Sequence, residues 1–142
     1  MLGQRPLQVI IRDDDVSAFT TVDDLVQLYG PVWEHDETVC LFVVPLASPQ
    51  IVEPRPQADP VEVVPLAKNA DLCVSLNRAI LSKHVEIGLH GLSHGPREFD
   101  ISNPIVVMDL LGKSKSLVKS VFPRAESVSY THLTLPTTLP RC

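Results

Sequence analysis

The chain contains the stretch VEIGLHGLSH at residues 85–94, in which a short apolar run leads straight into a pair of histidines. Residues 85–89 predict a buried strand, and His90 follows that strand directly. His90 and His94 are four positions apart, a spacing that lets two imidazoles meet on one face of a helical turn and grip a single ion. Two unrelated surface histidines would give the same sequence pattern. The pattern also lacks the glutamate that follows the first histidine in the zinc-protease motif.

Predicted strands and helices alternate on both sides of this stretch. Two further buried strands are predicted at residues 7–12 and 38–44, the second of them stopped by Pro45. Residues 45–65 hold six prolines and predict a long surface loop, with room for a short strand at residues 61–64. The first predicted helix is capped by Thr20 or Thr21 and breaks or kinks at Gly30-Pro31, and the second covers residues 71–82. The last predicted helix runs from Pro104 to about Val121 and is capped by Ser102 or Asn103. Its apolar face is formed by Val106, Leu110, Leu117 and Val121.

This order of elements predicts a parallel sheet covered by helices, an α/β architecture. Chemistry in such folds lies at the carboxyl ends of the strands. Two of the three predicted strands end in ionisable clusters, the first in Asp13-Asp14-Asp15 and the third in His90. We therefore expect the functional site at this edge of the sheet.

The acidic triplet is the second group that could carry chemistry. Three adjacent carboxylates repel one another, so one pKa should rise unless a cation lies among them. Neighbouring side chains of an extended segment point in different directions, so one carboxylate can bind a metal while the next faces a water. The alternative interpretation is that the triplet belongs to a solvent-exposed loop after a strand, where charged residues are common. Two neutral imidazoles and one carboxylate suit a catalytic divalent transition metal. Glu98, just beyond the histidines, either supports the pair or is simply exposed.

Composition excludes several other classes of protein. The 142 residues allow one ordinary domain, and the formal charge of -5 argues against nucleic acid as a partner. No apolar run is long enough to span a bilayer, and no signal peptide is visible. Three cysteines give neither a disulfide framework nor a paired-cysteine metal spacing, so we expect a cytoplasmic protein.

Three motifs in order resemble the polysaccharide deacetylase family, the chitooligosaccharide-deacetylase homology domain of carbohydrate esterase family 4. They are RDDD at residues 12–15, LFVVP at residues 41–45 and His-x-x-x-His at residues 90–94. The resemblance covers about residues 9–122, the front part of the family domain. It implies an incomplete (β/α) barrel with fewer than eight strands. It also implies a metal-dependent hydrolase that removes N- or O-linked acetyl groups from a carbohydrate.

The resemblance also implies roles for individual residues. In the family the first aspartate of a pair is the general base, and the second binds the metal with both histidines. Aligning Val16 with the small residue that follows this pair makes Asp14 the base, and makes Asp15, His90 and His94 the ligands of a divalent metal, most fittingly zinc. The triplet also permits the register in which Asp13 and Asp14 form the pair. The later arginine motif and the later histidine of the family are not found after residue 100.

The end of the chain has a different resemblance. Residues 128–137, VSYTHLTLPT, resemble the translation of a transposase sequencing adapter. We therefore expect residues 1–127 to be the N-terminal part of a deacetylase-like domain and residues 128–142 to be a non-native tail. The chain as given is then expected to lack part of the active site and to show no turnover. The sequence leaves two alternatives: a non-catalytic sugar-binding or regulatory domain of the same fold, and another single-metal amidohydrolase.

Overall fold

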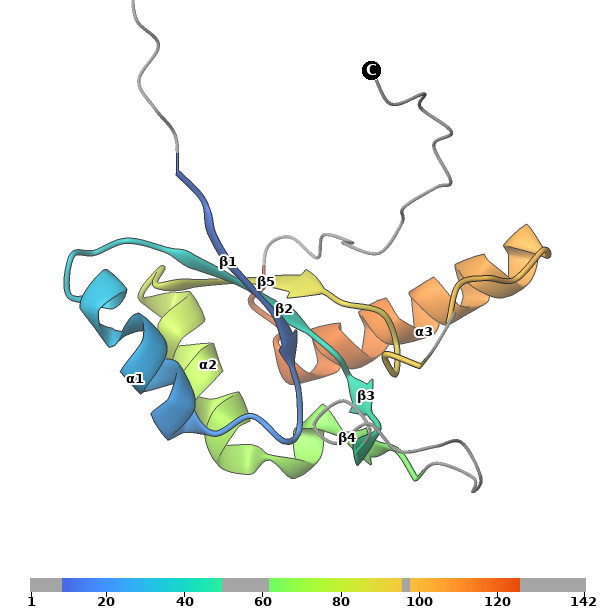
Figure 1. Ribbon diagram of the computed structural model, residues 1–142, viewed down its shortest axis with the longest axis horizontal. Helices are drawn as coiled ribbons and strands as arrows, with labels where there is room; N and C mark the ends of the chain where they lie inside the picture. The colour runs from blue at the N-terminus through green and yellow to red at the C-terminus, as the bar shows by residue number, and fades with distance from the viewer. Residues whose placement is uncertain (1–8, 50–61, 96–97, 126–142) are drawn as a thin grey trace, which may run out of the picture.

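A parallel sheet of three strands forms the centre of the computed structural model (Figure 1). The structure describes residues 9–49, 62–95 and 98–125. The strands are β1 (Ile11–Val16), β2 (Val39–Val43) and β5 (Val85–Leu89), in the order β1-β2-β5. Each strand is parallel to its neighbour, so the predicted α/β class is confirmed. Within the described residues the sheet does not close into a barrel.

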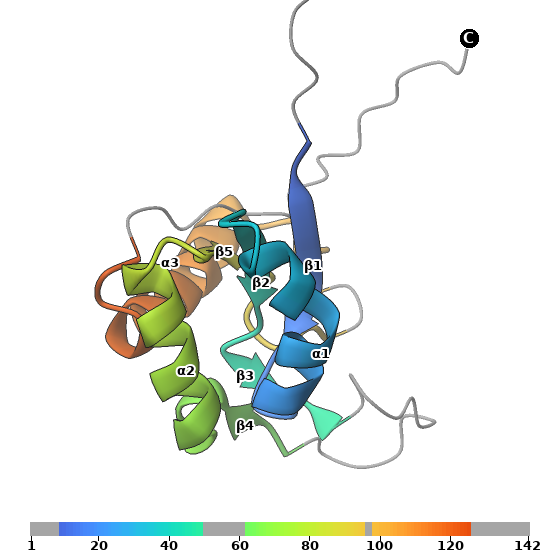
Figure 2. The same ribbon diagram turned by 90° about the vertical axis from the view of Figure 1, so that its left-hand side faces the viewer.

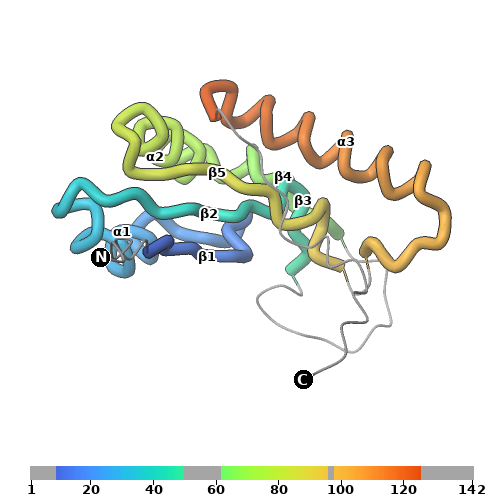
Figure 3. The backbone as a smooth tube through the Cα atoms, turned by 90° about the horizontal axis from the view of Figure 1, so that it is seen from above, coloured from blue at the N-terminus to red at the C-terminus, as the bar shows by residue number. Residues whose placement is uncertain are grey.

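Three α-helices pack against one face of this sheet (Figures 1 and 2). They are α1 (Val22–Trp33), α2 (Ala70–Leu81) and α3 (Pro104–Val121). Figure 3 shows α2 and α3 on the β5 side of the sheet. Strands and helices share one core, whose members include Leu25, Val39, Leu41, Val43, Leu72, Leu76, Ile87, Leu89, Val118 and Phe122.

The opposite face of the sheet is lined by a different set of side chains. Successive residues of a strand point to opposite faces, so Arg12, Cys40, Phe42 and Gly88 lie on the side away from the core. They line a groove of about 1030 Å³. This face therefore differs in kind from the helix-covered one, because it carries charged and polar groups beside an aromatic ring.

Part of the predicted proline-rich loop is ordered as short elements. β3 (Leu46–Ala47) pairs antiparallel with β4 (Val64–Pro65), and a single 3-10 turn, η2 (Leu66–Lys68), follows. The short strand thus lies at Val64–Pro65 and only touches the predicted position at residues 61–64. Most of the loop, and the predicted non-native tail at residues 128–142, lie outside the described residues.

The first strand differs from its prediction. The sequence predicted a strand at residues 7–12 that ends before the acidic triplet, whereas β1 runs through the triplet to Val16. The reason is backbone pairing with β2, which continues through Asp13↔Leu41 and resumes at Val16↔Val43 after a register shift. A strand is predicted from its pattern of buried apolar side chains. Because the carboxylates at these positions are charged and partly exposed, the pattern did not indicate that their backbone pairs with β2.

The first helix also differs, because Gly30-Pro31 does not break it. α1 continues through Pro31 to Trp33, and Thr21 is its N-cap. Pro31 lies in the last turn, so its missing N–H costs only one helical hydrogen bond close to where the helix ends. The amide of Glu34 still bonds to the carbonyl of Gly30 at 2.9 Å. The expected break at Gly30-Pro31 was therefore wrong.

The third helix begins and ends as predicted but buries a different face. Asn103 caps it and Pro104 is its first residue, as its sequence signals indicate. Its buried residues are Leu111, Ser114 and Val118, whereas the predicted Val106 is 40% exposed and Leu110, Leu117 and Val121 are half-buried. The buried stripe is thus displaced by one position from the predicted one. In the described part of the chain, no helix combines the length and the apolarity needed to cross a membrane.

Candidate metal centre

The carboxyl ends of the three strands lie side by side because the strands are parallel and in register. Val16 pairs with Val43, and Val43 pairs with Leu89. The residue after Leu89 is His90, whose amide donates to the carbonyl of Val43 at 2.9 Å. The same edge of the sheet therefore carries the end of the acidic triplet and the first histidine, as the sequence predicted.

The three carboxylates of the triplet point to different surroundings. Asp13 faces α1, where burial and then a hydrogen bond to Asp13 raise the pKa of Tyr29 to about 12. Asp15 would share that face in a regular strand. Instead the register shift between Asp13 and Val16, with Asp15 at a φ of 69°, turns the Asp15 carboxylate toward the histidines. The geometry therefore favours the register in which Asp15, rather than Asp13 or Asp14, is the ligand.

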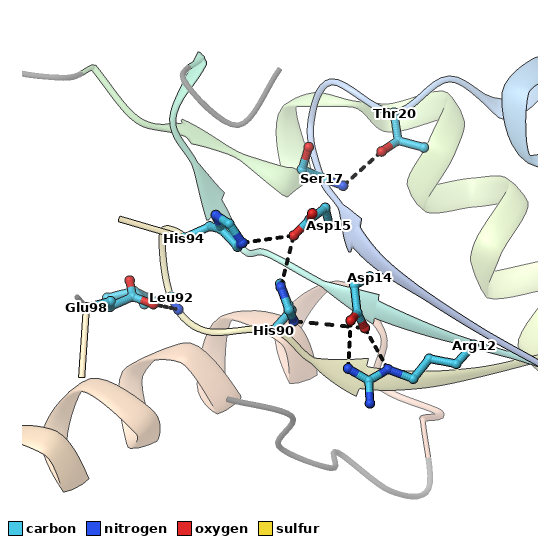
Figure 4. A network of polar contacts seen from close by, with 9 residues as sticks. All are labelled: Arg12, Asp14, Asp15, Ser17, Thr20, His90, Leu92, His94 and Glu98. Atoms are coloured by element: carbon cyan, nitrogen blue, oxygen red, sulfur yellow. Dashed lines mark hydrogen bonds and ion pairs between the residues drawn. The ribbon is translucent and has the colours of Figure 1, made fainter. Parts of the chain in front are cut away.

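Asp15, His90 and His94 converge on one point (Figure 4). Asp15 Oδ1 lies 2.9 Å from His90 Nε2 and 3.1 Å from His94 Nε2. The two imidazole rings stack with their centroids 5.0 Å apart. One ligand atom from each residue lies within 4.8 Å of the other two. Ligands about 2.0–2.2 Å from one ion are separated from each other by roughly 3–4 Å, so the donor atoms are close to the spacing that an ion needs.

The donor set and its exposure fit a catalytic rather than a structural metal. Two imidazole nitrogens and one carboxylate oxygen are three protein ligands, and catalytic zinc sites leave the fourth position to water or substrate. The His90 side chain is buried at 4% exposure, whereas His94 and Asp15 are 36% and 49% exposed. The site therefore opens to solvent on the side of these two residues.

Asp14 lies on the other side of His90. Its carboxylate accepts two hydrogen bonds from Arg12, at 2.8 Å from Nε and 2.6 Å from Nη2, and this bond raises the pKa of Arg12. The guanidinium is 4.5 Å from the centroid of the Phe42 ring. Asp14 Oδ1 is 4.0 Å from His90 Nδ1, too far for a direct hydrogen bond. Asp14 is thus held beside the ring nitrogen that does not face Asp15.

Two residues outside the candidate ligand set support the site. Glu98 accepts hydrogen bonds from the loop between the histidines, and Ser114 of α3 donates to the carbonyl of Gly91. Glu98 had two interpretations from the sequence, either as support for the histidine pair or as an exposed side chain. Ser114 was not identified from the sequence. A serine within an otherwise apolar helical stripe was the only signal for the second contact.

No protein-family model matches this chain, and neither a curated protein nor a solved structure matches it. The resemblance to the deacetylase family therefore stays a prediction, carried by the three sequence motifs alone.

Proposed function

We propose that Asp15, His90 and His94 bind one divalent metal ion, most fittingly zinc, and that the protein is a hydrolase that removes acetyl groups from a carbohydrate. The observation that carries this proposal is the approach of Asp15 Oδ1 to both histidine Nε2 atoms, at 2.9 and 3.1 Å. The three residues come from the ends of two different strands, and such convergence is typical of functional sites in α/β folds.

A bound metal of this kind polarises a carbonyl and lowers the pKa of its water. In this proposal Asp14 takes a proton from the attacking water as general base while the new C–O bond forms. The bond between the acetyl group and the sugar then breaks, and the same proton passes to the leaving amine or alcohol, which releases acetate. Arg12 donates one hydrogen bond to each Asp14 oxygen and so fixes the orientation of this carboxylate. The charge of Arg12 also favours the ionised form that a base requires.

The carbohydrate substrate and the acetyl group rest on the order of the three motifs, since the metal geometry alone suits any small amide or ester. Activity as another single-metal amidohydrolase is therefore a result that the assay described below can reveal, and it is not a separate proposal. Hydrolysis of phosphate esters is disfavoured, because such enzymes commonly use a second metal and the described residues offer one ligand group of three.

Acetate release from acetylated oligosaccharides tests the function. Because the sequence resemblance predicts that the chain ends in a non-native tail, the assay compares the zinc-loaded 142-residue chain, for which we expect no turnover, with the zinc-loaded product of the full source gene. We expect acetate release by the gene product, its loss in the His94→Ala variant, and its retention in a His35→Ala control, whose histidine lies in an exposed turn. Release of amine from simple amides without acetate from any sugar would contradict the proposal and favour an amidohydrolase.

A further inference from the structure

The loop that joins the two candidate histidine ligands has an unusual backbone. Gly91 has a φ of +76° and His94 a φ of 57°. Glycine adopts such angles freely, whereas a positive φ at a histidine is uncommon and persists where surrounding contacts enforce it. His94 presents its ring to Asp15 from this conformation, so contacts that hold the loop also place a ligand.

Glu98 supplies the densest of these contacts. One carboxylate oxygen accepts from the amide of Leu92 at 2.8 Å. The other accepts from the amide of Ser93 at 2.6 Å and from its hydroxyl at 2.7 Å. Two successive amides that converge on a carboxylate form a small anion-binding nest, and hydrogen bonds to an ionised acceptor are among the stronger ones in proteins.

The loop is closed on its other sides as well. A Cβ on residue 91 would collide with the Glu98 carboxylate and displace it, and the positive φ at this position also favours glycine. Ser114 donates to the carbonyl of Gly91 at 2.5 Å, and the amide of Leu46 donates to the carbonyl of Leu92 at 2.9 Å. Among these contacts, those of Glu98 reach both residues that immediately precede His94, Leu92 and Ser93.

We propose that Glu98 is a positioning residue of the metal centre, which fixes the loop so that His94 reaches Asp15. The proposal rests on the proposed metal site. Glu98 acts through Leu92 and Ser93, because its carboxylate accepts hydrogen bonds from these two residues and Ser93 directly precedes the candidate ligand His94. Residues that orient metal ligands in this way contribute roughly 10–100-fold to metal affinity.

The decisive variant is Glu98→Gln. Glutamine has the same size, but its amide nitrogen donates and cannot accept, so one N–H of the loop loses its partner. We expect the zinc dissociation constant, measured by competition with a chromophoric chelator, to rise roughly 10–100-fold. The absorption spectrum of the Co²⁺-loaded chain should change as well. The matched control is Glu37→Gln, an exposed carboxylate in the short loop before β2, which should leave both readings unchanged.

Two further measurements separate positioning from general stabilisation. Urea unfolding of the metal-free variants shows whether the fold is intact, and amide hydrogen exchange at Leu92 and Ser93 shows whether the loop is loosened. Ser93→Ala removes only the hydroxyl bond and provides a milder variant, which should weaken zinc binding in the same direction by a smaller factor.

The outcomes are distinct. If the unaltered chain binds zinc and the folded Glu98→Gln variant binds it with the same affinity, the positioning role is overturned and the metal site stands. An unaltered chain that binds no zinc overturns the proposed function and with it the role of Glu98 in a metal centre. Weakened binding with unchanged exchange at Leu92 and Ser93 also contradicts the proposal, because the effect would not then pass through the loop.

Discussion

Asp14 and Asp15 are neighbours in the sequence but face different nitrogens of one imidazole. Asp15 Oδ1 lies 2.9 Å from Nε2 of His90, and Asp14 Oδ1 lies 4.0 Å from Nδ1. The alternation of an extended strand and the register shift after Asp13 produce this division. Substitutions at the two positions should therefore have different consequences.

Asn substitutions at the two aspartates test their roles. Asp15→Asn should weaken zinc binding, because it removes the anionic ligand. Asp14→Asn should leave zinc affinity nearly intact and lower acetate release by the gene product roughly 10²–10⁴-fold, the contribution of a general base. Competition titrations and the acetate assay measure the two effects. An equal loss of zinc in both variants would refute this division and show that Asp14 acts through Nδ1 of His90, as carboxylates beside metal-bound histidines do.

Gly88 supports the same region from β5, because the Phe42 ring occupies the space of a Cβ at this position. Gly88→Ala should displace the ring on which Arg12 rests and lower the free energy of unfolding by about 1–3 kcal/mol, the usual cost of overpacking. The control is Gly112→Ala in α3, where an added Cβ would meet open space and where alanine should stabilise the helix by up to about 1 kcal/mol. Urea unfolding compares the two variants, and equal stability of both would contradict the packing argument.

At the scale of elements, Asn69 joins α2 to the segment that leads from β1 to α1. Its Oδ1 accepts from the amide of Leu72 as the helix N-cap, and its Nδ2 donates to the carbonyls of Ala18 and Thr20 at 3.1 and 2.8 Å. One side chain thus caps the start of α2 and holds the loop that follows β1, the strand of the candidate ligand.

Two variants at Asn69 separate these contributions. Asn69→Asp keeps an N-cap of similar strength but loses both amide donors, whereas Asn69→Ala loses the cap as well. We expect unfolding free energies in the order Asn above Asp above Ala, with about 1 kcal/mol for the cap and about 1 kcal/mol for each donor bond. Thermal or urea unfolding gives the order. An Asp variant as stable as the parent would show that the bonds to the loop contribute nothing.

Elements with strong local signals were predictable from the sequence. β5 matches its predicted range, α2 is displaced by one residue, and α3 begins at Pro104 after the Asn103 cap. The course of β1 through the triplet was not predictable, since strand pairing rather than side-chain pattern sets it. Pro31 misled the prediction because a proline near a helix end costs less than one in its middle.

At the scale of the whole molecule, the convergence of the triplet with the histidines could be predicted because parallel strands end at one edge of a sheet. The choice of Asp15 within the triplet could only be inferred from the resemblance, since it depends on a positive φ that no local pattern indicates. The contacts of Glu98 and Ser114 depend on how the loop and α3 pack, and the sequence carried little sign of them.

A metal at this centre would join β1 to the segment after β5 and should stabilise the chain. Free zinc at 100 times its dissociation constant should add about 2.7 kcal/mol to the free energy of unfolding. The melting temperature measured with zinc should therefore exceed that measured with a chelator, and His94→Ala should abolish the difference. An equal zinc effect in that variant would place the stabilising metal elsewhere.

The assignment of a metal centre is tested most directly by counting the zinc ions that each chain retains. Each chain is incubated with zinc and passed through a gel-filtration column, and its zinc content is then measured by elemental analysis. We expect about one zinc ion per chain for the parent and for the His35→Ala control, and almost none for Asp15→Asn and His94→Ala. Retention of zinc by His94→Ala at the level of the parent, or absence of zinc from the parent itself, would contradict the assignment of Asp15, His90 and His94 as a metal centre.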